Sequence, residues 1–533
     1  MSERTVTAAL IAAIALGMAY RLATLVLPAM PLVEFYITED GYLMLTVARN
    51  LAIGNGLSVA GGEIATNGIQ PLATFIYALP YVATGGDKTT SIAGVIVIMA
   101  AIAGLATWAV WRFAAAVLGP MVPRIGPEAR WRPVWPMLAA ALFSLGPLLM
   151  FHSMNALETG LYTLAVVVTV LFFARLAGTG RAMTLGEQLA FGALCGTVFL
   201  CRNDGAVLVV ALFAVRFLQV WLVIGRGVAG FRAAVIEALP PGLVSLAIAA
   251  PWLVYNYLLF GSIVPISGHA QSITALFGAN AALLPVKLFE HMFPMLPVPG
   301  GMELEPAVMA VAGIAWGAVF VAGLVLVWRA GGGMRLAVAA YALYALGLAA
   351  HYGFNFGAAH FMSRYLAPTA PLMIVLALAV AVALVTRATE RFGRRAAQGL
   401  PVALSAVSVV LCLGLLAREL VPGEHEQGHF QVVRWVEENV GDETWVGAVQ
   451  TGTLGYWHDR TLNLDGKVNP DALRARMETG SVREYVVASP IQYLADWPGI
   501  LLWMEDETSP LAQAFEIAVH DERARLVVLA RRE

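Results

Sequence analysis

The chain has 533 residues, of which 59% are hydrophobic and only 13% are charged, about half the charged share of a soluble domain. A mean hydropathy of +0.74 over the whole length excludes an ordinary soluble protein, because burial of so much apolar surface needs lipid as the solvent. The net charge of −2 gives no basic surface, so no nucleic-acid partner is expected.

Apolar segments of about the length of a membrane-spanning helix recur along the chain. They are predicted at residues 5–27, 90–112, 137–154, 159–177, 187–201, 205–224, 235–255, 305–328, 335–353, 366–386 and 399–417. One further apolar run, residues 71–84, is only about four helical turns long and contains Pro80. Length alone therefore does not decide whether that run crosses the membrane.

The distribution of arginine decides the side on which each loop lies, since cytoplasmic loops are enriched in Lys and Arg. Clusters of arginine in the loops, together with Arg4, comprise Arg112, Arg124, Arg130, Arg132, Arg175, Arg181, Arg226, Arg232, Arg329, Arg335, Arg387, Arg391, Arg394 and Arg395. These positions fall in alternate loops, which predicts a cytoplasmic N-terminus and an extracytoplasmic C-terminus. Residues 28–89 then form one outer loop, with 71–84 as a membrane-surface helix, and residues 256–304 form another.

Residues 420–533 are richer in charge and carry short β-type runs at 445–450 and 525–530, with a helical pattern at 428–440. This pattern predicts a small α/β domain on the outer face. The expected fold class is an α-helical polytopic membrane protein with about eleven transmembrane helices. Residues 1–419 would form its membrane domain, and residues 420–533 its small C-terminal extracytoplasmic domain.

Two adjacent acids, Glu39 and Asp40, follow the first spanning segment on the predicted outer side. Adjacent residues at the start of a helix point in different directions, so the two carboxylates can hold two roles. One could act as a base on a hydroxyl group, and the other could orient that hydroxyl or bind a metal. The alternative is structural, with either acid capping the helix that runs through Arg49 and Leu51.

Other polar residues gather at the predicted outer ends of helices. Glu158 is either a first-turn acid favoured by the helix dipole or a group that points into a site. Arg202 and Asp204 lie between two apolar runs, where charged groups are costly unless they are paired or functional. His360 and Arg364 share a helical face. Arg364 could bind a phosphate through two hydrogen bonds, or it could be an interfacial arginine, and Arg21 raises the same question.

Taken together, these motifs resemble the GT-C superfamily of membrane glycosyltransferases nearly from end to end. The first outer loop carries the pattern of two acids, a small residue and an aromatic residue, then AxN, GxG and TNGxxPL. The matching residues are Glu39–Tyr42, Ala48–Asn50, Gly54–Gly56 and Thr66–Leu72. The opening Glu-Asp-Gly-Tyr is also similar to the acidic motif of polyprenyl-phosphate arabinosyltransferases, and the group includes mannosyltransferase-like members.

Later motifs extend the resemblance into the C-terminal region. The patterns GMET, RPDG, FGSxxPxSG and RYxxP correspond to Ala156–Thr159, Arg202–Gly205, Phe260–Gly268 and Arg364–Pro368. Two further patterns, GxxQxGxLGY and NLDGxVN, correspond to Gly447–Tyr456 and Asn463–Asn469.

The resemblance implies that a bacterial inner-membrane enzyme transfers sugar outside the cytoplasm. Its donor would be a polyprenyl-phosphate monosaccharide bound at the lipid bilayer, and its acceptor an extracytoplasmic glycan, lipid or protein. Asp40 or Glu39 would deprotonate the acceptor hydroxyl. The phosphate leaves already ionised and needs cations more than an acid. The donor-binding candidates are Arg364, Arg202, Arg21, His360 and Tyr365. The acceptor-binding or supporting candidates are Tyr42, Asn50, Asn67, Gln70, Glu158, Asp204, Ser267, His269 and Gln271.

The sequence departs from the group's pattern at several cationic or acidic positions. The first acid of the pair is usually Asp but is Glu39 here, which leaves the base open between Glu39 and Asp40. Thr46 replaces an arginine, Gln70 a histidine and Gln271 a lysine. Fewer cations imply a different donor head group or compensation by His269 or Arg49. A divalent cation is the one cofactor to consider, and Glu39 and Asp40 would be its ligands.

Two other functions are compatible with the composition. A transporter or flippase of a lipid-linked saccharide would place charged or broken helices at the middle of the membrane. A non-catalytic glycan-assembly protein would bind sugar without an acid at the anomeric carbon. The sequence shows few charges inside the spanning segments, which favours the glycosyltransferase.

Overall fold

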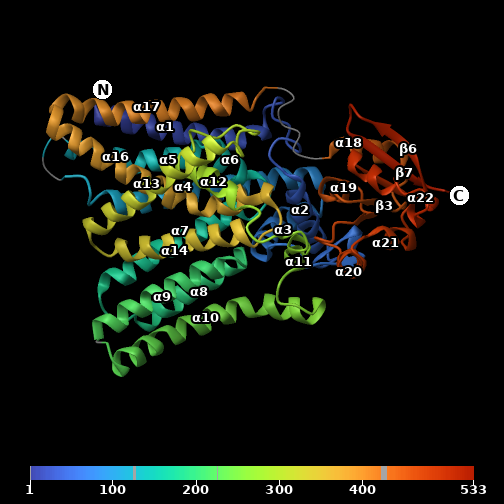
Figure 1. The fold of residues 1–533 in the computed structure, drawn as a ribbon, viewed down its shortest axis with the longest axis horizontal. Helices are drawn as coiled ribbons and strands as arrows, with labels where there is room; N and C mark the ends of the chain where they lie inside the picture. Colours follow the sequence, from blue (N-terminus) through green and yellow to red (C-terminus); the bar gives the residue numbers. More distant parts are fainter. Residues whose placement is uncertain (1, 124–125, 127, 225, 422–428, 533) are drawn as a thin grey trace.

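The computed structural model describes residues 2–123, 126, 128–224, 226–421 and 429–532 (Figure 1). Arg124, one of the predicted cytoplasmic arginines, lies outside these residues, as do the first residues of the predicted outer domain after 421. The described chain divides into a large helical bundle and a smaller domain at one end of it (Figure 1).

Nine helices in the described part of the chain are long and apolar enough to cross a membrane. They contain α1 (Glu3–Leu22), α4 (Lys88–Leu118), α7 (Thr159–Thr179), α9 (Gly205–Ile224), α10 (Val228–Phe260), α13 (Pro306–Ala330), α14 (Met334–Phe354), α16 (Ala370–Phe392) and α17 (Arg394–Arg418). The short helix α15 (Met362–Leu366) leads into α16 as part of the same span, Ala359–Phe392. Each of the nine corresponds to a segment predicted from hydropathy.

The two remaining predicted spans have other shapes. The single helix expected at 137–154 is a bent pair, α5 (Val134–Leu145) and α6 (Pro147–Met154), with a bend of 60°. The break falls at Gly146 and Pro147, because proline cannot continue the hydrogen bonding of the preceding helix. The helix α8 (Leu185–Cys201) has only 17 residues. The segments predicted as about eleven crossings are, in the described residues, nine long helices, a bent pair and one shorter helix.

Several short elements gather at the end of the bundle that carries the smaller domain, here called the domain end. They are α2 (Glu39–Ala52), β1 (Ser58–Val59), β2 (Ile64–Ala65), α3 (Pro71–Thr84), α11 (Ile266–Ser272) and α12 (Leu284–Met292). The run predicted as a short helix is α3, which has 14 residues, begins at a proline and ends before Gly85. A helix of that length is too short to span a bilayer.

The smaller domain, residues 429–532, is here called the C-terminal domain. Its sheet has the strand order β4-β3-β5-β7-β6, with β3 parallel to β4 and β5, and β7 antiparallel to β5 and β6. The strands are β3 (Val446–Ala448), β4 (Thr461–Asn463), β5 (Tyr493–Asp496), β6 (Phe515–Asp521) and β7 (Leu526–Arg531). The helices are α18 (Phe430–Asn439), α19 (Gly452–Trp457), α20 (Pro470–Thr479), α21 (Arg483–Ala488) and α22 (Pro510–Ala514). Its mixed helices and strands match the predicted α/β composition.

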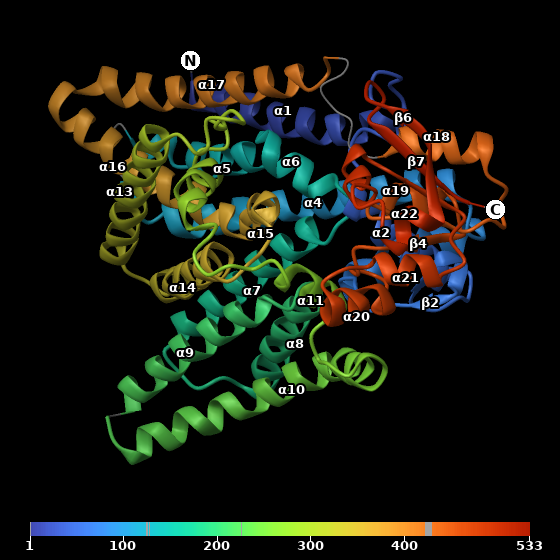
Figure 2. The same cartoon turned by 45° about the vertical axis from the view of Figure 1, so that its right-hand side comes forward.

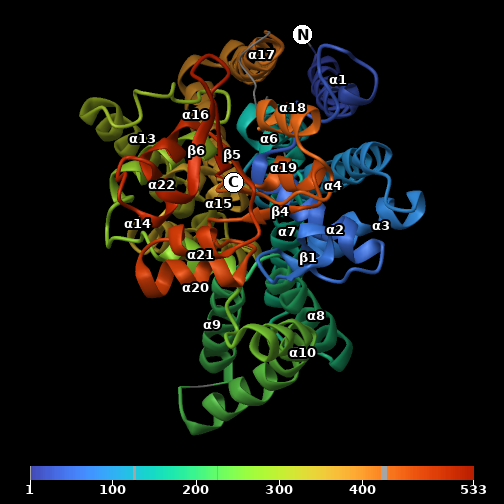
Figure 3. The same ribbon diagram turned by 90° about the vertical axis from the view of Figure 1, so that its right-hand side faces the viewer.

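The C-terminal domain packs directly on the first loop of the bundle. Figure 3 shows it facing the viewer, with α19 next to α2, and Figure 2 shows α20 beside α11. A buried aromatic cluster joins the two parts. The ring of Tyr456 lies 5.1 Å from that of Tyr42, and its hydroxyl is hydrogen-bonded to that of Tyr81 at 2.8 Å. The first loop and the C-terminal domain therefore share one core.

The far end of the bundle carries the arginine-bearing connections. The turns between α9 and α10 and between α16 and α17 lie at the end remote from the C-terminal domain (Figure 1). Arg226 lies in the first of these turns, and Arg391 lies in the last helical turn of α16, just before the second. The asymmetry of polar residues in the sequence therefore corresponds to two opposite ends of the bundle.

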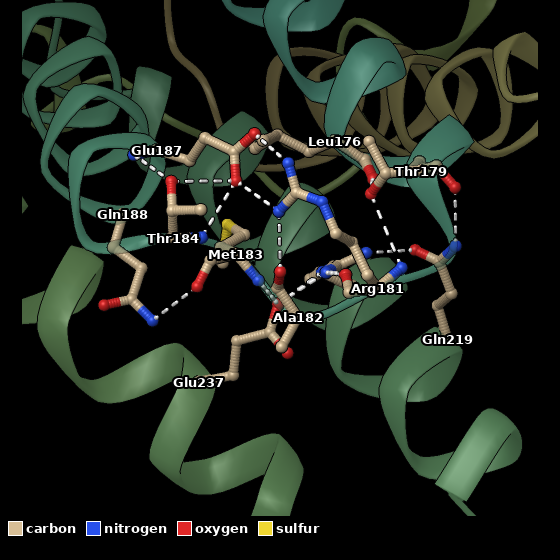
Figure 4. A network of polar contacts seen from close by, with 12 residues as sticks. Leu176, Thr179, Arg181, Ala182, Met183, Thr184, Glu187, Gln188, Gln219 and Glu237 are labelled. Carbon is tan, nitrogen blue, oxygen red and sulfur yellow. Dashed lines mark hydrogen bonds and ion pairs between the residues drawn. The ribbon is translucent and has the colours of Figure 1, made fainter.

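One polar network at the far end fastens the turn between α7 and α8 (Figure 4). Arg181 binds both carboxylate oxygens of Glu187, each at 2.8 Å, and Glu187 also forms a capping box with Thr184. Arg216 of α9 donates to Glu237 of α10 at 2.9 Å and to the carbonyl of Arg181 at 2.7 Å. The network ties α8, α9 and α10 together at a distance from the domain end.

Candidate functional site

A cavity of about 320 Å³ opens at the domain end between the first loop, the ends of several helices and the C-terminal domain. Its charged lining residues are Asp40, Glu158, Arg202, Asp204, Arg364 and Lys467. Three acids thus face three cations in one cavity. Charged groups at such a density, close to a membrane domain, are costly unless they are paired, so the pairing defines the site.

Asp40 enters the cavity from the first turn of α2. The helix is capped by Thr38, whose hydroxyl accepts a hydrogen bond from the Gly41 amide at 3.3 Å. The alternative that Glu39 or Asp40 is the cap is therefore wrong, and both carboxylates remain available for other contacts. Asp40 binds Arg364 at 3.1 Å and Lys467 at 3.3 Å, and its side chain is 16% exposed.

The two cations change the acidity of Asp40. Burial alone would raise the pKa of this carboxyl group, but Lys467 and Arg364 outweigh burial and lower the pKa to about 2. Burial lowers the pKa of the Lys467 ammonium, but the carboxylates of Asp40 and Asp465 outweigh burial and raise that pKa above its ordinary value. Asp40 is therefore an anion over the physiological pH range, held between two cations.

Glu39 points away from the cavity, toward the C-terminal domain. Its carboxylate accepts hydrogen bonds from the amides of Gly452 and Thr453 and from the Thr453 hydroxyl. Glu39 and Asp40 therefore have separate partners, and the arrangement does not make them joint ligands of one metal ion. Glu39 instead fastens α2 to the start of α19.

Burial raises the pKa of Glu39 to about 7, although the hydrogen bonds from Thr453 and Gly452 act in the opposite direction. Burial also raises the pKa of the nearby Asp496 carboxyl, to about 6. A raised acid pKa means that the folded state binds more protons than the unfolded state. Both groups therefore favour the folded state most at low pH.

The thermal midpoint of the detergent-solubilised protein should accordingly fall as pH rises from about 4.5 to about 7. The substitution Glu39→Gln removes the group with the larger pKa shift. The thermal midpoint should then depend less steeply on pH, and the remaining dependence should be due to Asp496. Scanning fluorimetry from pH 4 to pH 8 measures both curves. A midpoint that rises over this range, or identical slopes for the two proteins, would contradict the assignment.

Arg202 is the centre of a second cluster of charged side chains in the cavity wall. Its guanidinium binds Glu158 at 3.1 Å, Asp204 at 3.1 Å and the hydroxyl of Tyr352 at 3.1 Å. Tyr352 in turn donates to Asp204. Two carboxylates thus neutralise one buried arginine, which makes Arg202 a structural counter-ion of Glu158 and Asp204.

Tyr365 separates the two arginines of the cavity. The guanidinium carbon of Arg202 lies 3.7 Å from the centroid of this ring, and that of Arg364 lies 4.8 Å from it. Arg364 also donates to the Tyr365 hydroxyl at 3.0 Å. The aromatic ring therefore contacts both cations through its π-face and fixes their separation.

Neutral amide and hydroxyl side chains also line the cavity wall: Gln70, Asn203, Ser267, Gln271, Ser272 and Asn355. The side-chain carbonyl oxygens of Gln70 and Asn203 and one carboxylate oxygen of Asp204 are buried and have no hydrogen-bond partner among the described residues. Buried acceptors usually have donors, so these oxygens mark positions where a ligand hydroxyl would be well bound.

The predicted site residues thus fall into two groups. The cavity contains Asp40, Arg364, Arg202, Tyr365, Gln70, Glu158, Asp204, Ser267 and Gln271. Glu39, Arg21, His360, Tyr42, Asn50, Asn67 and His269 are not among its lining residues. His360 is exposed and its ring contacts that of Phe361, and His269 binds Ser262 at 3.0 Å.

The residues outside the cavity have structural partners. Arg21 is 1% exposed and donates to the carbonyls of Ser144 and Gly17. Tyr42 donates to the carbonyl of Val33, and Asn50 to that of Ser58.

Two further candidates also have partners of their own. Asn67 accepts a hydrogen bond from the Ile266 amide and donates to Asn256. Arg49, proposed as a compensating cation, pairs with Asp459 at 3.5 Å at the seam with the C-terminal domain. Neither Asn67 nor Arg49 lines the cavity.

Several cavity residues were not singled out from the sequence, among them Lys467, Tyr352 and Asn203. Lys467 belongs to the Asn463–Asn469 motif, which the sequence showed without assigning it a role. Tyr352 lies in a spanning helix and resembles any other core tyrosine in the sequence. Across the part of the chain that the structure describes, no group of three or more His, Cys, Asp or Glu side chains has the arrangement of a metal site.

At the level of sequence, the chain matches known proteins only in its C-terminal region. Residues 418–527 match a family model described as a domain of unknown function, DUF8728. No curated protein sequence matches the chain. The C-terminal domain is therefore related to a family that has no assigned role.

Comparison of structures is more informative. The chain is similar to ArnT from Cupriavidus metallidurans bound to undecaprenyl phosphate, with a TM-score of 0.56, 13% identity and 98% coverage of both chains. It is also similar to the Archaeoglobus fulgidus oligosaccharyltransferase AglB in complex with an inhibitory peptide and a dolichol phosphate. That match has a TM-score of 0.55 and 14% identity, and it covers 92% of this chain and 70% of AglB. Both likenesses include the membrane helices and the domain that follows them. The chain therefore has the fold of the GT-C superfamily.

Proposed function

We propose that this protein is a membrane glycosyltransferase that moves a monosaccharide from a polyprenyl-phosphate donor to an extracytoplasmic acceptor. The observation that carries the proposal is the cavity at the domain end, in which one carboxylate, Asp40, faces two cations beside unpaired acceptor oxygens. A base, a phosphate site and hydroxyl-binding groups are the elements that sugar transfer from a phosphate donor requires.

The proposed reaction uses Asp40 as the general base. The acceptor hydroxyl gives its proton to Asp40 while its oxygen bonds to the anomeric carbon of the sugar. The bond between that carbon and the phosphate oxygen breaks, and the polyprenyl phosphate leaves as an anion. Arg364 stabilises this anion, since it has one carboxylate partner, whereas Arg202 already has two.

The free acceptor oxygens of Gln70, Asn203 and Asp204 would bind hydroxyl groups of the transferred sugar. Glu158 and Arg202 would hold Asp204 in position. These assignments make the cavity polar on the sugar side and cationic on the phosphate side.

The two structural neighbours bind undecaprenyl phosphate and dolichol phosphate, which supports a lipid-linked donor for this chain. We propose that residues 1–419 form the catalytic membrane domain and residues 420–533 an extracytoplasmic domain. The N-terminus would be cytoplasmic, in a bacterial inner membrane, because the arginine-bearing turns lie at the far end of the bundle.

Mass spectrometry of cell-envelope glycans and lipid-linked sugars, with and without this chain, tests the proposal. Loss of the protein should remove one glycan residue and raise the level of one polyprenyl-phosphate sugar. Purified protein in nanodiscs should then consume that lipid in the presence of envelope extract. A flippase would move the lipid across the membrane without cleaving it, and an assembly protein would leave the lipid intact, so either result would reject the proposal.

A further inference from the structure

The turn between β4 and α20 places one ammonium group in the cavity. The backbone amide of Lys467 donates to the Asp465 carboxylate at 2.8 Å, and the Gly466 amide donates to Asn463 at 3.0 Å. Asn469 closes the turn with a hydrogen bond to the carbonyl of Asn463 at 2.9 Å and another to Tyr485 at 3.0 Å. The turn is thus held by its own side chains, and the long Lys467 side chain extends from a fixed base.

The C-terminal domain is also positioned against the first loop by direct backbone contact. A Cβ atom on Gly68 would lie 1.9 Å from the carbonyl oxygen of Lys467, and one on Gly452 would lie 1.7 Å from that of Glu39. Only glycine permits such approaches. The two contacts fix the turn that carries Lys467 against the loop that carries Asp40 and Gln70.

The ion pairs of the cavity show which carboxylate a bound phosphate would displace from its cations. Lys467 lies 3.3 Å from both Asp40 and Asp465, and Arg364 lies 3.1 Å from Asp40. Asp40 is therefore the anion that the two cations share. The Nε atom of Arg364 is buried and has no hydrogen-bond partner among the residues described here, so this guanidinium retains donor capacity.

From these contacts we infer that the C-terminal domain is part of the active site, where Lys467 and Arg364 together bind the donor's phosphate in competition with the carboxylate of Asp40. The inference rests on the proposed function for its ligand, a polyprenyl phosphate, and it gives the family of unknown function matched at 418–527 a role in this chain. The domain supplies one of the two cations of the phosphate site.

The competition has a chemical consequence for the base. Without a phosphate, both cations stabilise the Asp40 anion, and a carboxylate stabilised in this way is a weak base. A bound phosphate draws the two cations toward itself and adds negative charge beside Asp40. Both changes raise the proton affinity of Asp40, so the base becomes effective only when the donor is in place.

The test is binding of undecaprenyl phosphate to the full-length protein in detergent, followed by microscale thermophoresis. Lys467→Met should weaken binding about tenfold or more, because it removes a charge-assisted contact, and Lys467→Arg should restore most of it. Asp40→Asn should tighten binding, because it removes the competing anion. Undecaprenol, which has no phosphate, and inorganic phosphate separate the contribution of the lipid from that of the head group.

Lys88→Met is the matched control. Lys88 also joins the bundle to the C-terminal domain, through Asp459 at 3.3 Å and the carbonyl of Trp457 at 3.0 Å, but it does not line the cavity. It should lower the thermal midpoint about as much as Lys467→Met while leaving lipid binding unchanged. Equal loss of binding in both lysine variants would show that Lys467 only fastens the domain.

Two further outcomes would overturn the inference: unchanged affinity in Lys467→Met, or weaker binding in Asp40→Asn. Binding of undecaprenyl phosphate is measured without sugar transfer, so the inference and the proposed function fail separately. If the variants behave as expected and no polyprenyl-phosphate sugar is ever consumed, the phosphate site stands and the glycosyltransferase proposal falls.

Discussion

Replacement of Asp40 by asparagine is expected to lower the rate of sugar transfer by about 10²–10⁴-fold, the usual contribution of a general base. Asparagine has nearly the same shape and keeps an oxygen for Arg364 or Lys467, but it cannot accept the acceptor's proton. The fold should persist, because Asp40 caps no helix and its partners retain Tyr365 and Asp465. Turnover of the polyprenyl-phosphate sugar by purified protein gives the measurement.

Glu39→Gln is the matched control for Asp40→Asn. Glu39 is adjacent in sequence but binds Gly452 and Thr453 instead of the cavity. Its amide analogue should retain most of the activity and show the altered pH dependence of stability described above. Full activity in Asp40→Asn, or a greater loss in Glu39→Gln, would transfer the role of base away from Asp40.

Replacement of Arg202 by methionine should lower the free energy of unfolding by about 3–5 kcal/mol, the usual effect of removing one partner from a buried ion pair. The side chains of Glu158 and Asp204 are only 4% and 10% exposed, so two carboxylates would remain in the wall without their cation. Thermal or chemical unfolding in detergent, followed by tryptophan fluorescence, measures the loss.

Two further variants separate charge from geometry at this position. Arg202→Lys keeps the cation but cannot bind both acids through a planar group, so an intermediate stability is expected. Removing one acid together with the arginine, in Arg202→Met with Glu158→Gln, should recover part of the loss. An Arg202→Met protein as stable as the parent would show that the ion pairs of Arg202 do not stabilise the fold.

The helical bundle was largely predictable because hydropathy reports directly on the lipid-facing part of each helix. The helix ends were not, since α10 runs from Val228 to Phe260 whereas its apolar pattern covered only 235–255. Helices continue beyond their apolar stretch wherever backbone hydrogen bonding is undisturbed. The bend at Gly146 and Pro147 was visible in the sequence as two adjacent helix breakers, but the apolar pattern continues through them.

The sequence predicted cavity residues in several separate segments, but not which of these segments meet in space. Asp40 and Gln70 came from one loop, and Arg202 and Asp204 from one turn. Arg21 does not line the cavity, and its partner carbonyl at Ser144 comes from a helix 123 residues away. A buried arginine satisfied by carbonyls and one available to a phosphate have the same local sequence.

The roles of the adjacent residues Glu39 and Asp40 also depend on contacts with residues far away in the sequence. The sequence indicated that the two side chains point in different directions but not which one points into a cavity. That choice depends on where the C-terminal domain lies, because its Gly452 and Thr453 bind Glu39 and its Lys467 binds Asp40. Hydropathy carries no information on the docking of a polar domain.

The contact between Asp40 and Lys467 joins residues 427 positions apart in the chain, and it has a consequence for biosynthesis. Synthesis proceeds from the N-terminus, so all the spanning helices leave the ribosome before Lys467 does. The nascent chain therefore enters the membrane with Asp40 and Arg364 present and one cation of the site still missing. We expect an unfinished or truncated chain to insert normally yet bind its lipid more weakly than the completed molecule, which favours activity in completed molecules.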